Sequence, residues 1–108
     1  MRRAMVYMHG IAAGILTEEN QESYIFRYHD VYFFDFAMPA ISLTISKKRQ
    51  EYKSDFLFPF FYNLLSEGVN RALQCNRLNI DEKDHFGLLL ATATEDTIGA
   101  VTLKPVIE

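Results

Sequence analysis

The segment of residues 56–68, FLFPFFYNLLSEG, constrains the fold of this chain more than any other. It gathers five aromatic side chains around Pro59 and continues through Leu64 and Leu65. It is too short to span a bilayer, which takes roughly 20 apolar residues. One helix needs fewer aromatic residues than this to anchor a small core. The segment is therefore either the centre of the fold or, in part, a surface for another protein.

The size and composition of the chain are those of a globular domain. Its 108 residues predict a single domain over residues 1–108. Apolar residues make up 49% and charged residues 23% of the chain, which is typical of a folded protein and not of a disordered one. The net charge of −3 disfavours nonspecific nucleic-acid binding, which needs Lys and Arg to neutralise phosphates. We therefore expect no direct contact with nucleic acid.

Cys75 is the only cysteine, so the chain has no internal disulfide and no zinc cluster built on cysteines. A lone thiol fits a reducing cytosol, and we expect a cytoplasmic protein. The apolar stretch after Met1-Arg2-Arg3 is interrupted by His9, Gly10 and Gly14 and alternates like a strand. We therefore expect no targeting segment and no membrane span.

Strand patterns fill the first third of the chain. Residues 4–8 and 11–17 flank the turn His9-Gly10, which predicts an N-terminal hairpin with Gly10 at positive φ. Gly14 indicates a bulge or a close backbone contact within that hairpin. Residues 23–28 alternate between core and solvent and predict a third strand.

The middle of the chain gives mixed signals. Residues 31–38 fit either a short helix or an irregular packed loop. Residues 41–46 alternate cleanly and predict a strand with one wet face. Residues 47–54 are polar and predict a loop, with a strand around Tyr52 as the alternative.

After Pro59, the apolar residues recur with the spacing of a helix. Pro59 suits the first position of that helix because its missing N–H would be unpaired there. Residues 60–65 make about two turns, and Gly68 ends that helix or begins the next. The next helix should end near Leu78-Asn79. Its predicted buried face consists of Val69, Ala72, Leu73 and Asn76.

A third helix follows, with Asp81 or Asp84 as its cap. Its predicted apolar stripe is Phe86, Leu89, Leu90 and Ala93. Gly99 ends the connection to a final strand at residues 100–104. The order of elements predicts an α+β fold: a small, mostly antiparallel sheet with an N-terminal hairpin, packed against about three helices.

No group of residues has the spacing of a catalytic, cofactor or metal site. Tyr28-His29-Asp30 superficially resembles the catalytic loop of protein kinases, but that loop needs an Asn at the position of Asp35. We interpret it as a strand end followed by a turn. The three histidines are scattered, and the carboxylates at residues 81–84 suit a helix start better than acid–base catalysis. We expect a protein that is not an enzyme, with no cofactor and no metal.

Three ordered segments nevertheless match a known module. The first is VYMHGIAAGIL at residues 6–16, followed by residues 26–28 and 41–44; the second is FYNLLSEG at residues 61–68, followed by residues 71–73. The third is DHFGLL at residues 84–89, followed by residues 95–101. Together they resemble the N-terminal subdomain of the HipA family of bacterial toxin kinases, over residues 5–105. The family usually has Pro where Ser66 stands and Cys where Thr97 stands.

The resemblance implies a role. HipA-family kinases carry their ATP-binding and catalytic residues in the core that follows this subdomain, whereas this sequence ends at Glu108. It is therefore similar to the small separate proteins of split HipBST systems (HipS-like). There a HipB-like DNA-binding protein, the small protein and a HipT-like kinase are separate chains, and the small protein restrains the kinase as an antitoxin.

Three hypotheses follow from this resemblance. The first is a non-catalytic antitoxin that binds a HipA/HipT-like Ser/Thr kinase. The second is an accessory subunit that completes the kinase and supports phosphoryl transfer. The third is a regulator that acts on DNA through a HipB-like helix-turn-helix partner.

The expected partner-binding residues follow from the same resemblance. They are Phe61, Leu64, Leu65, Ser66, Glu67, Gly68, Asp96 and Gly99. Apolar side chains at helical spacing are more often core than interface, so the apolar members of this set have a competing structural role. Ser66, Glu67 and Gly68 are the better interface candidates because nothing in a core requires them.

Overall fold

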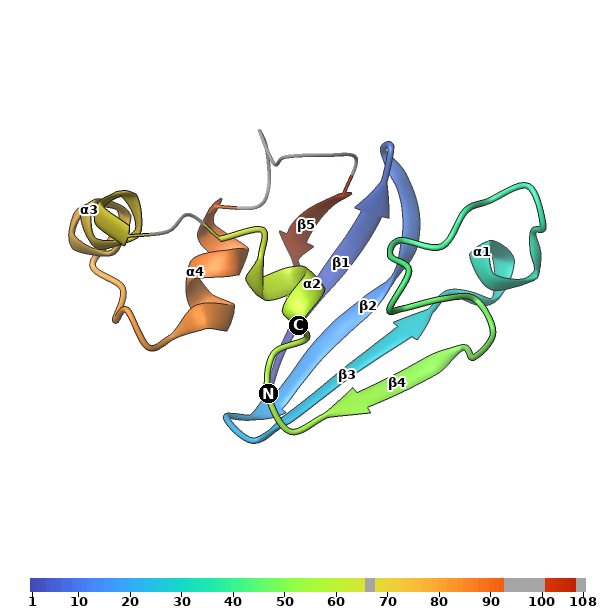
Figure 1. Cartoon of the computed structure of the whole chain (residues 1–108), viewed down its shortest axis with the longest axis horizontal. Coiled ribbons are helices and arrows are strands. Elements are labelled where there is room, and N and C mark those ends of the chain that lie inside the picture. Colours follow the sequence, from blue (N-terminus) through green and yellow to red (C-terminus); the bar gives the residue numbers. More distant parts are fainter. Residues whose placement is uncertain (66–67, 93–100, 107–108) are drawn as a thin grey trace.

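The computed structural model describes residues 1–65, 68–92 and 101–106, which form a five-stranded antiparallel sheet and four helices (Figure 1). The strands lie in the order β4-β3-β2-β1-β5. Their bounds are Arg2–Met8 (β1), Ile11–Asn20 (β2), Ser23–Tyr28 (β3), Glu51–Ser54 (β4) and Val101–Pro105 (β5). The helices are Asp30–Phe34 (α1), Pro59–Tyr62 (α2), Gly68–Leu78 (α3) and His85–Thr92 (α4). The predicted α+β class with an N-terminal hairpin is confirmed.

The N-terminal hairpin is built as its sequence predicts. His9 and Gly10 have φ values of 50° and 79°, which suit the tight turn between two antiparallel strands. The register of β1 against β2 shifts between Val6 and Tyr7, opposite Gly14, so the predicted bulge is confirmed. The bulge increases the local twist of the hairpin and turns it over the core.

Gly14 lies where a side chain has no room, and Gly14→Ala is expected to lower the free energy of unfolding by about 1–3 kcal/mol. A Cβ there would contact the carbonyl oxygen of Arg27 and come within 2.8 Å of Cζ of Phe26. Gly10→Asn is the control, because a Cβ at Gly10 meets nothing within 4 Å and Asn tolerates positive φ. Urea denaturation measures both variants, and equal stability of Gly14→Ala and the parent chain would contradict the prediction.

One face of the sheet carries the core. The fully buried side chains of β1, β2 and β3 include Val6, Leu16, Phe26 and Tyr28. Helices α2 and α4 cover this face. Their buried side chains are Phe61, Phe86, Leu88 and Leu89, and the β5 residues Val101 and Leu103 join the same core. Of the predicted α4 stripe, Phe86 and Leu89 are buried and Leu90 is half-buried, whereas Ala93 lies outside the described residues.

The predicted strand at residues 41–46 is wrong, because this segment is an irregular loop between α1 and β4. The alternation predicts that Ile41, Leu43 and Ile45 share one buried face, but Ile41 and Ile45 are buried and Leu43 is fully exposed. The hydroxyl of Tyr28 holds the two buried residues, because it accepts the N–H of Ile41 at 3.1 Å and donates to the carbonyl of Ile45. For residues 31–38 the sequence left a short helix or an irregular loop open, and the structure has the short helix α1 there. For residues 47–54 it left a strand around Tyr52 open, and Tyr52 lies in β4.

The helices around residues 59–80 differ in detail from expectation. Pro59 is the first residue of α2 as predicted, but α2 ends at Tyr62 and continues only as a turn through Leu65. Helix α3 begins at Gly68 and ends at Leu78, where Asn79 takes a left-handed φ of 59°. None of the helices in the described parts of the chain is long and apolar enough to cross a bilayer.

The predicted buried face of α3 is wrong. Ala72, Leu73 and Asn76 are exposed, and the side chain of Val69 lies outside the described residues. Among the α3 side chains that the structure describes, that of Cys75 is buried. Cys75 lies about 110° around the helix from the centre of the predicted face. Over residues 72–78, α3 therefore buries a small side chain, at a position that the spacing of its larger apolar residues does not indicate.

Candidate partner-binding site

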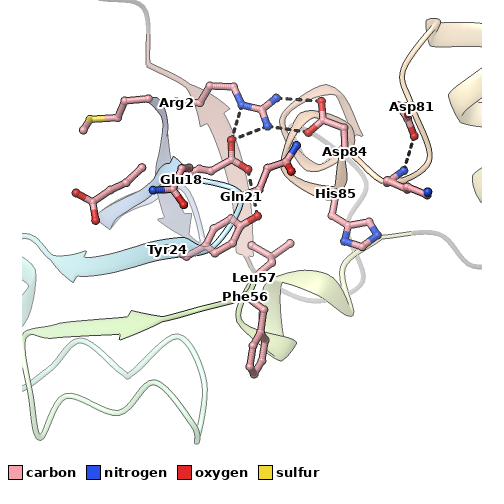
Figure 2. Close-up of a pocket in the computed structure, with 13 residues that line it drawn as sticks. Arg2, Glu18, Gln21, Tyr24, Phe56, Leu57, Asp81, Asp84 and His85 are labelled. Carbon is pink, nitrogen blue, oxygen red and sulfur yellow. Dashed lines mark hydrogen bonds and ion pairs between the residues drawn. The ribbon is translucent and has the colours of Figure 1, made fainter.

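Three charged side chains that are distant in the sequence meet at one end of the sheet (Figure 2). Arg2 in β1 donates to Oε1 of Glu18 in β2, from Nε at 2.8 Å and from Nη2 at 2.6 Å. It also donates to both carboxylate oxygens of Asp84, from Nη2 at 2.7 Å and from Nη1 at 3.1 Å. Because Asp84 precedes α4, the Arg2–Glu18–Asp84 cluster ties this helix to the first hairpin.

The cluster is held by further contacts on each side. The backbone N–H of Gly87 donates to Oδ1 of Asp84 at 3.0 Å, so Asp84 caps α4 as predicted. The hydroxyl of Tyr24 donates to Oε2 of Glu18 at 3.2 Å, and the guanidinium of Arg2 lies 5.2 Å from the ring centre of Phe86. Each charged group is therefore fixed by at least one neighbour outside the cluster.

The electrostatics of the cluster suit a structural link. The hydrogen bond from Arg2 lowers the pKa of the Asp84 carboxyl, against the opposing effect of burial. The hydrogen bond to Asp84 also raises the pKa of Arg2, and burial together with Glu18 raises the pKa of the Tyr24 hydroxyl. Near neutral pH, Asp84 and Arg2 keep their charges and Tyr24 keeps its proton, so none of the three is suited to proton transfer.

A pocket of about 790 Å³ lies beside the cluster (Figure 2). The charged side chains line one side of it, and Phe56, Leu57 and His85 line another. Phe56 is 64% exposed, which places a large aromatic side chain at the surface. In the parts of the chain that the structure describes, no group of three or more His, Cys, Asp or Glu side chains could hold a metal ion.

Helix α2 lies next to this pocket and is fixed from two sides. The ring of Phe61 lies 5.8 Å from that of Phe26 in the sheet, measured between centroids. The ring of Tyr62 lies 5.0 Å from that of His85 at the start of α4. The position of α2 therefore depends both on the aromatic core and on the helix that the charged cluster holds.

The expected partner-binding residues fall into three groups. Phe61 and Leu65 are buried in the core, and Leu64 is half-buried. Gly68 is the first residue of α3. Ser66, Glu67, Asp96 and Gly99 lie outside the described residues. The assignment of these residues to an interface stays a prediction, and Leu64 is its apolar member with a partly exposed side chain in the structure.

Helix α2 and its flanking residues add Phe56, Phe60 and Asn63 to Leu64, which is already among the expected partner-binding residues. Phe60 and Leu64 are half-buried, Asn63 is exposed, and Phe56 precedes them. We call these four residues the α2 patch. Helical spacing was the available signal, because Phe60, Asn63 and Leu64 are three and four residues apart. The patch is the candidate partner-binding site of the described part of the chain.

Comparisons with known proteins identify the module. The HipA N-terminal domain family matches residues 4–104. An uncharacterized protein of Haemophilus influenzae is 30% identical over 104 residues, which cover 96% of this chain and 92% of that protein. A solved N-terminal domain of HipA toxin superimposes with a TM-score of 0.75 at 26% identity, over 100% of this chain and 95% of that chain. With nearly its whole length matched, the chain belongs to the HipA N-terminal domain family.

Proposed function

We propose that this chain is a non-catalytic, kinase-binding component of a bacterial toxin–antitoxin system, an antitoxin that restrains a HipA/HipT-like Ser/Thr kinase. The likeness to the N-terminal domain of HipA toxin, over the full length of this chain, carries the proposal. A domain that serves a toxin within one chain can serve a kinase body from a separate chain if it keeps the complementary surface. Because such a kinase uses ATP, we place both proteins in the cytoplasm.

The α2 patch supports this proposal. Exposed apolar side chains that gather on one surface are typical of sites where another protein binds. Aromatic anchors such as Phe56 supply a large share of the binding energy in interfaces of this kind. The proposed interface also includes the expected residues Ser66, Glu67, Gly68, Asp96 and Gly99.

The charged cluster supports the non-catalytic part of the proposal. Arg2 is engaged by two carboxylates, so it is poorly placed to bind a phosphate group. Asp84 uses Oδ1 both to cap α4 and to accept from Arg2. The cluster holds α4, which contacts α2 through the rings of His85 and Tyr62, and in this proposal the kinase supplies the chemistry.

Co-expression tests the proposal. A HipA/HipT-like kinase is expressed with and without this chain, and growth and kinase autophosphorylation are followed. We expect growth to be rescued and autophosphorylation to fall when this chain is present. Toxicity only when both chains are present would contradict the antitoxin and support the accessory subunit. A HipB-like protein added as a third chain tests the DNA-associated role.

The Leu64→Asp variant is expected to weaken binding to the kinase at least tenfold, because the complex would bury an unpaired carboxylate. Leu43→Asp is the matched control, since Leu43 is fully exposed in the loop before β4 and the chemical change is the same. Circular dichroism establishes that both variants fold, and titration calorimetry measures the Kd. Equal affinities for Leu64→Asp and Leu43→Asp would place the interface away from the α2 patch.

A further inference from the structure

The sheet face opposite the core has an apolar centre. Solvated faces of antiparallel sheets are usually polar. Here the central positions of this face are Met5, Ile15, Thr17 and Ile25, all half-buried. A shallow groove of about 290 Å³ runs over Ile15, Thr17 and Ile25. We call this surface the open face. Its apolar centre is not needed for the core, which lies on the other side of the sheet.

The strand register gives the layout of the open face. Two neighbouring rows of side chains cross the sheet. The first row, from β4 to β1, is Lys53, Ile25, Thr17 and Arg3. The second row, from β4 to β5, is Glu51, Arg27, Ile15, Met5 and Lys104. In both rows, basic side chains lie on either side of the apolar centre.

The dimensions of this layout match an α-helix. Lys53 and Arg3 are three strand spacings apart, as are Arg27 and Lys104, which is about 14 Å. A helix with its side chains is about 10–12 Å wide, so it fits between these basic residues. The two rows are two residues apart along the strands, about 7 Å, close to the rise of one helical turn. A helix along the strands can therefore place successive apolar turns over successive rows.

The charge of the open face selects the kind of helix. Among the described residues, the open face holds four basic side chains and three carboxylates, those of Glu19, Glu51 and Asp30. Its formal charge is therefore +1, whereas the whole chain carries −3. Nη1 of Arg27 lies 4.0 Å from Oε1 of Glu51, and Nη2 of Arg27 lies 3.7 Å from Oδ1 of Asp30. The ammonium of Lys104 lies 5.5 Å from the ring centre of Tyr7. The excess positive charge favours an acidic partner.

We propose that the open face binds an acidic amphipathic helix of a partner protein. The apolar stripe of that helix lies over Ile15 and Ile25, and its flanking carboxylates reach Lys53 on one side and Lys104 on the other. Nucleic acid fits less well, because bases stack on exposed aromatic rings. The centre of the face is aliphatic, and the ring of Tyr7 beside it is covered by the ammonium of Lys104. A face-to-face dimer fits less well because it would bring like charges together. The proposal is independent of the kinase partnership.

Fluorescence anisotropy with a defined probe tests this inference. The probe is an 18-residue synthetic helix with a leucine stripe flanked by Glu, compared with the same peptide flanked by Lys and with an 18-base-pair DNA duplex. We expect the full chain to bind the Glu peptide at least tenfold more tightly than the Lys peptide. Lys53→Glu/Lys104→Glu should reverse this preference, whereas Lys48→Glu/Lys83→Glu, the same charge change at exposed residues elsewhere, should keep it.

A second pair of variants tests how much the apolar centre of the open face contributes to binding of the Glu peptide. Ile25→Ser should weaken binding of the Glu peptide at least fivefold, and Ile11→Ser, at a partly exposed position at the hairpin end, should leave it unchanged. Equal affinity for the two peptides would overturn the proposal, as would tighter binding of the DNA than of the Glu peptide. Self-association in analytical ultracentrifugation that Ile25→Ser abolishes would also overturn it, in favour of a second copy of this chain.

Discussion

The Phe61→Ala variant is expected to lose about 3–5 kcal/mol of unfolding free energy, a large fraction of the total stability of a small domain. Phe61 is fully buried, and its ring lies within 5.2–6.2 Å of those of Phe26, Phe58 and Phe60, centroid to centroid. Removing it leaves a cavity between α2 and the sheet. The loss combines the lost burial of the ring with the cost of that cavity.

Urea denaturation followed by circular dichroism measures this loss, with Phe36→Ala as the matched control. Phe36 is fully exposed, so its truncation should change stability by less than about 0.5 kcal/mol. Phe61 is also one of the expected partner-binding residues, and the experiment separates its two roles. A stable Phe61→Ala protein that no longer binds the kinase would make Phe61 a direct contact and contradict its place in the core.

The parts of the fold that the sequence predicts well are those set by local chemistry. His9-Gly10 supplies the positive φ values of the hairpin turn, and the alternation of β3 places Phe26 and Tyr28 in the core. Pro59 and Asp84 mark helix starts because each satisfies a backbone requirement of the first turn. The structural role of each of these residues depends on residues within a few positions of it in the sequence.

The predicted strand at residues 41–46 failed because its pattern has a distant cause. The hydroxyl of Tyr28 contacts the backbone of both Ile41 and Ile45, so these two side chains are buried in a loop while Leu43 between them is exposed. Burial also raises the pKa of this hydroxyl to about 12, so it stays protonated and remains a donor at neutral pH. A pattern of apolar residues cannot distinguish burial by a partner strand from burial around one tyrosine.

The candidate site was only partly predictable for the same reason. The register at the hairpin turn, extended without a bulge, pairs Arg2 with Thr17, and the shift between Val6 and Tyr7 moves the pair to Arg2 and Glu18. The pair follows from the sequence only if the bulge that Gly14 indicates is included. Asp84 is 82 residues away from Arg2, and no local signal connects them. The interface residues were expected from the family resemblance, and the structure then separates buried Phe61 and Leu65 from half-buried Leu64.

The Arg2→Met variant is expected to lower the free energy of unfolding by about 2 kcal/mol at pH 7. Methionine keeps most of the packing against Phe86 but leaves Glu18, which is only 8% exposed, beside Asp84 without a compensating cation. Removing one member of a fully buried pair costs about 3–5 kcal/mol. We expect a smaller loss of about 2 kcal/mol for Arg2→Met because the Arg2 side chain is 39% exposed and solvent screens its charge.

Two further variants separate this effect from a general loss of charge. Arg27→Met removes an exposed arginine of the same sheet, 54% exposed and with its nearest carboxylate at 3.7 Å, and should cost less than about 0.5 kcal/mol. Arg2→Met/Glu18→Gln should regain part of the loss, because the amide is neutral and can still accept from Tyr24. A double variant no more stable than Arg2→Met would mean that the unpaired carboxylate is not the cause.

The pH dependence gives the strongest test of the cluster. Arg2 lowers the pKa of Asp84 in the folded chain, so this interaction stabilises the fold above the unfolded-state pKa of about 4 and is lost as the pH falls through the folded-state value. Arg2 stays charged at every accessible pH, so no matching loss occurs at alkaline pH. The stability difference between the parent chain and Arg2→Met should therefore be full at pH 7 and shrink below pH 4. A difference of the same size at pH 7 and pH 3 would show that Arg2 stabilises the fold through packing on Phe86 and not through its carboxylates.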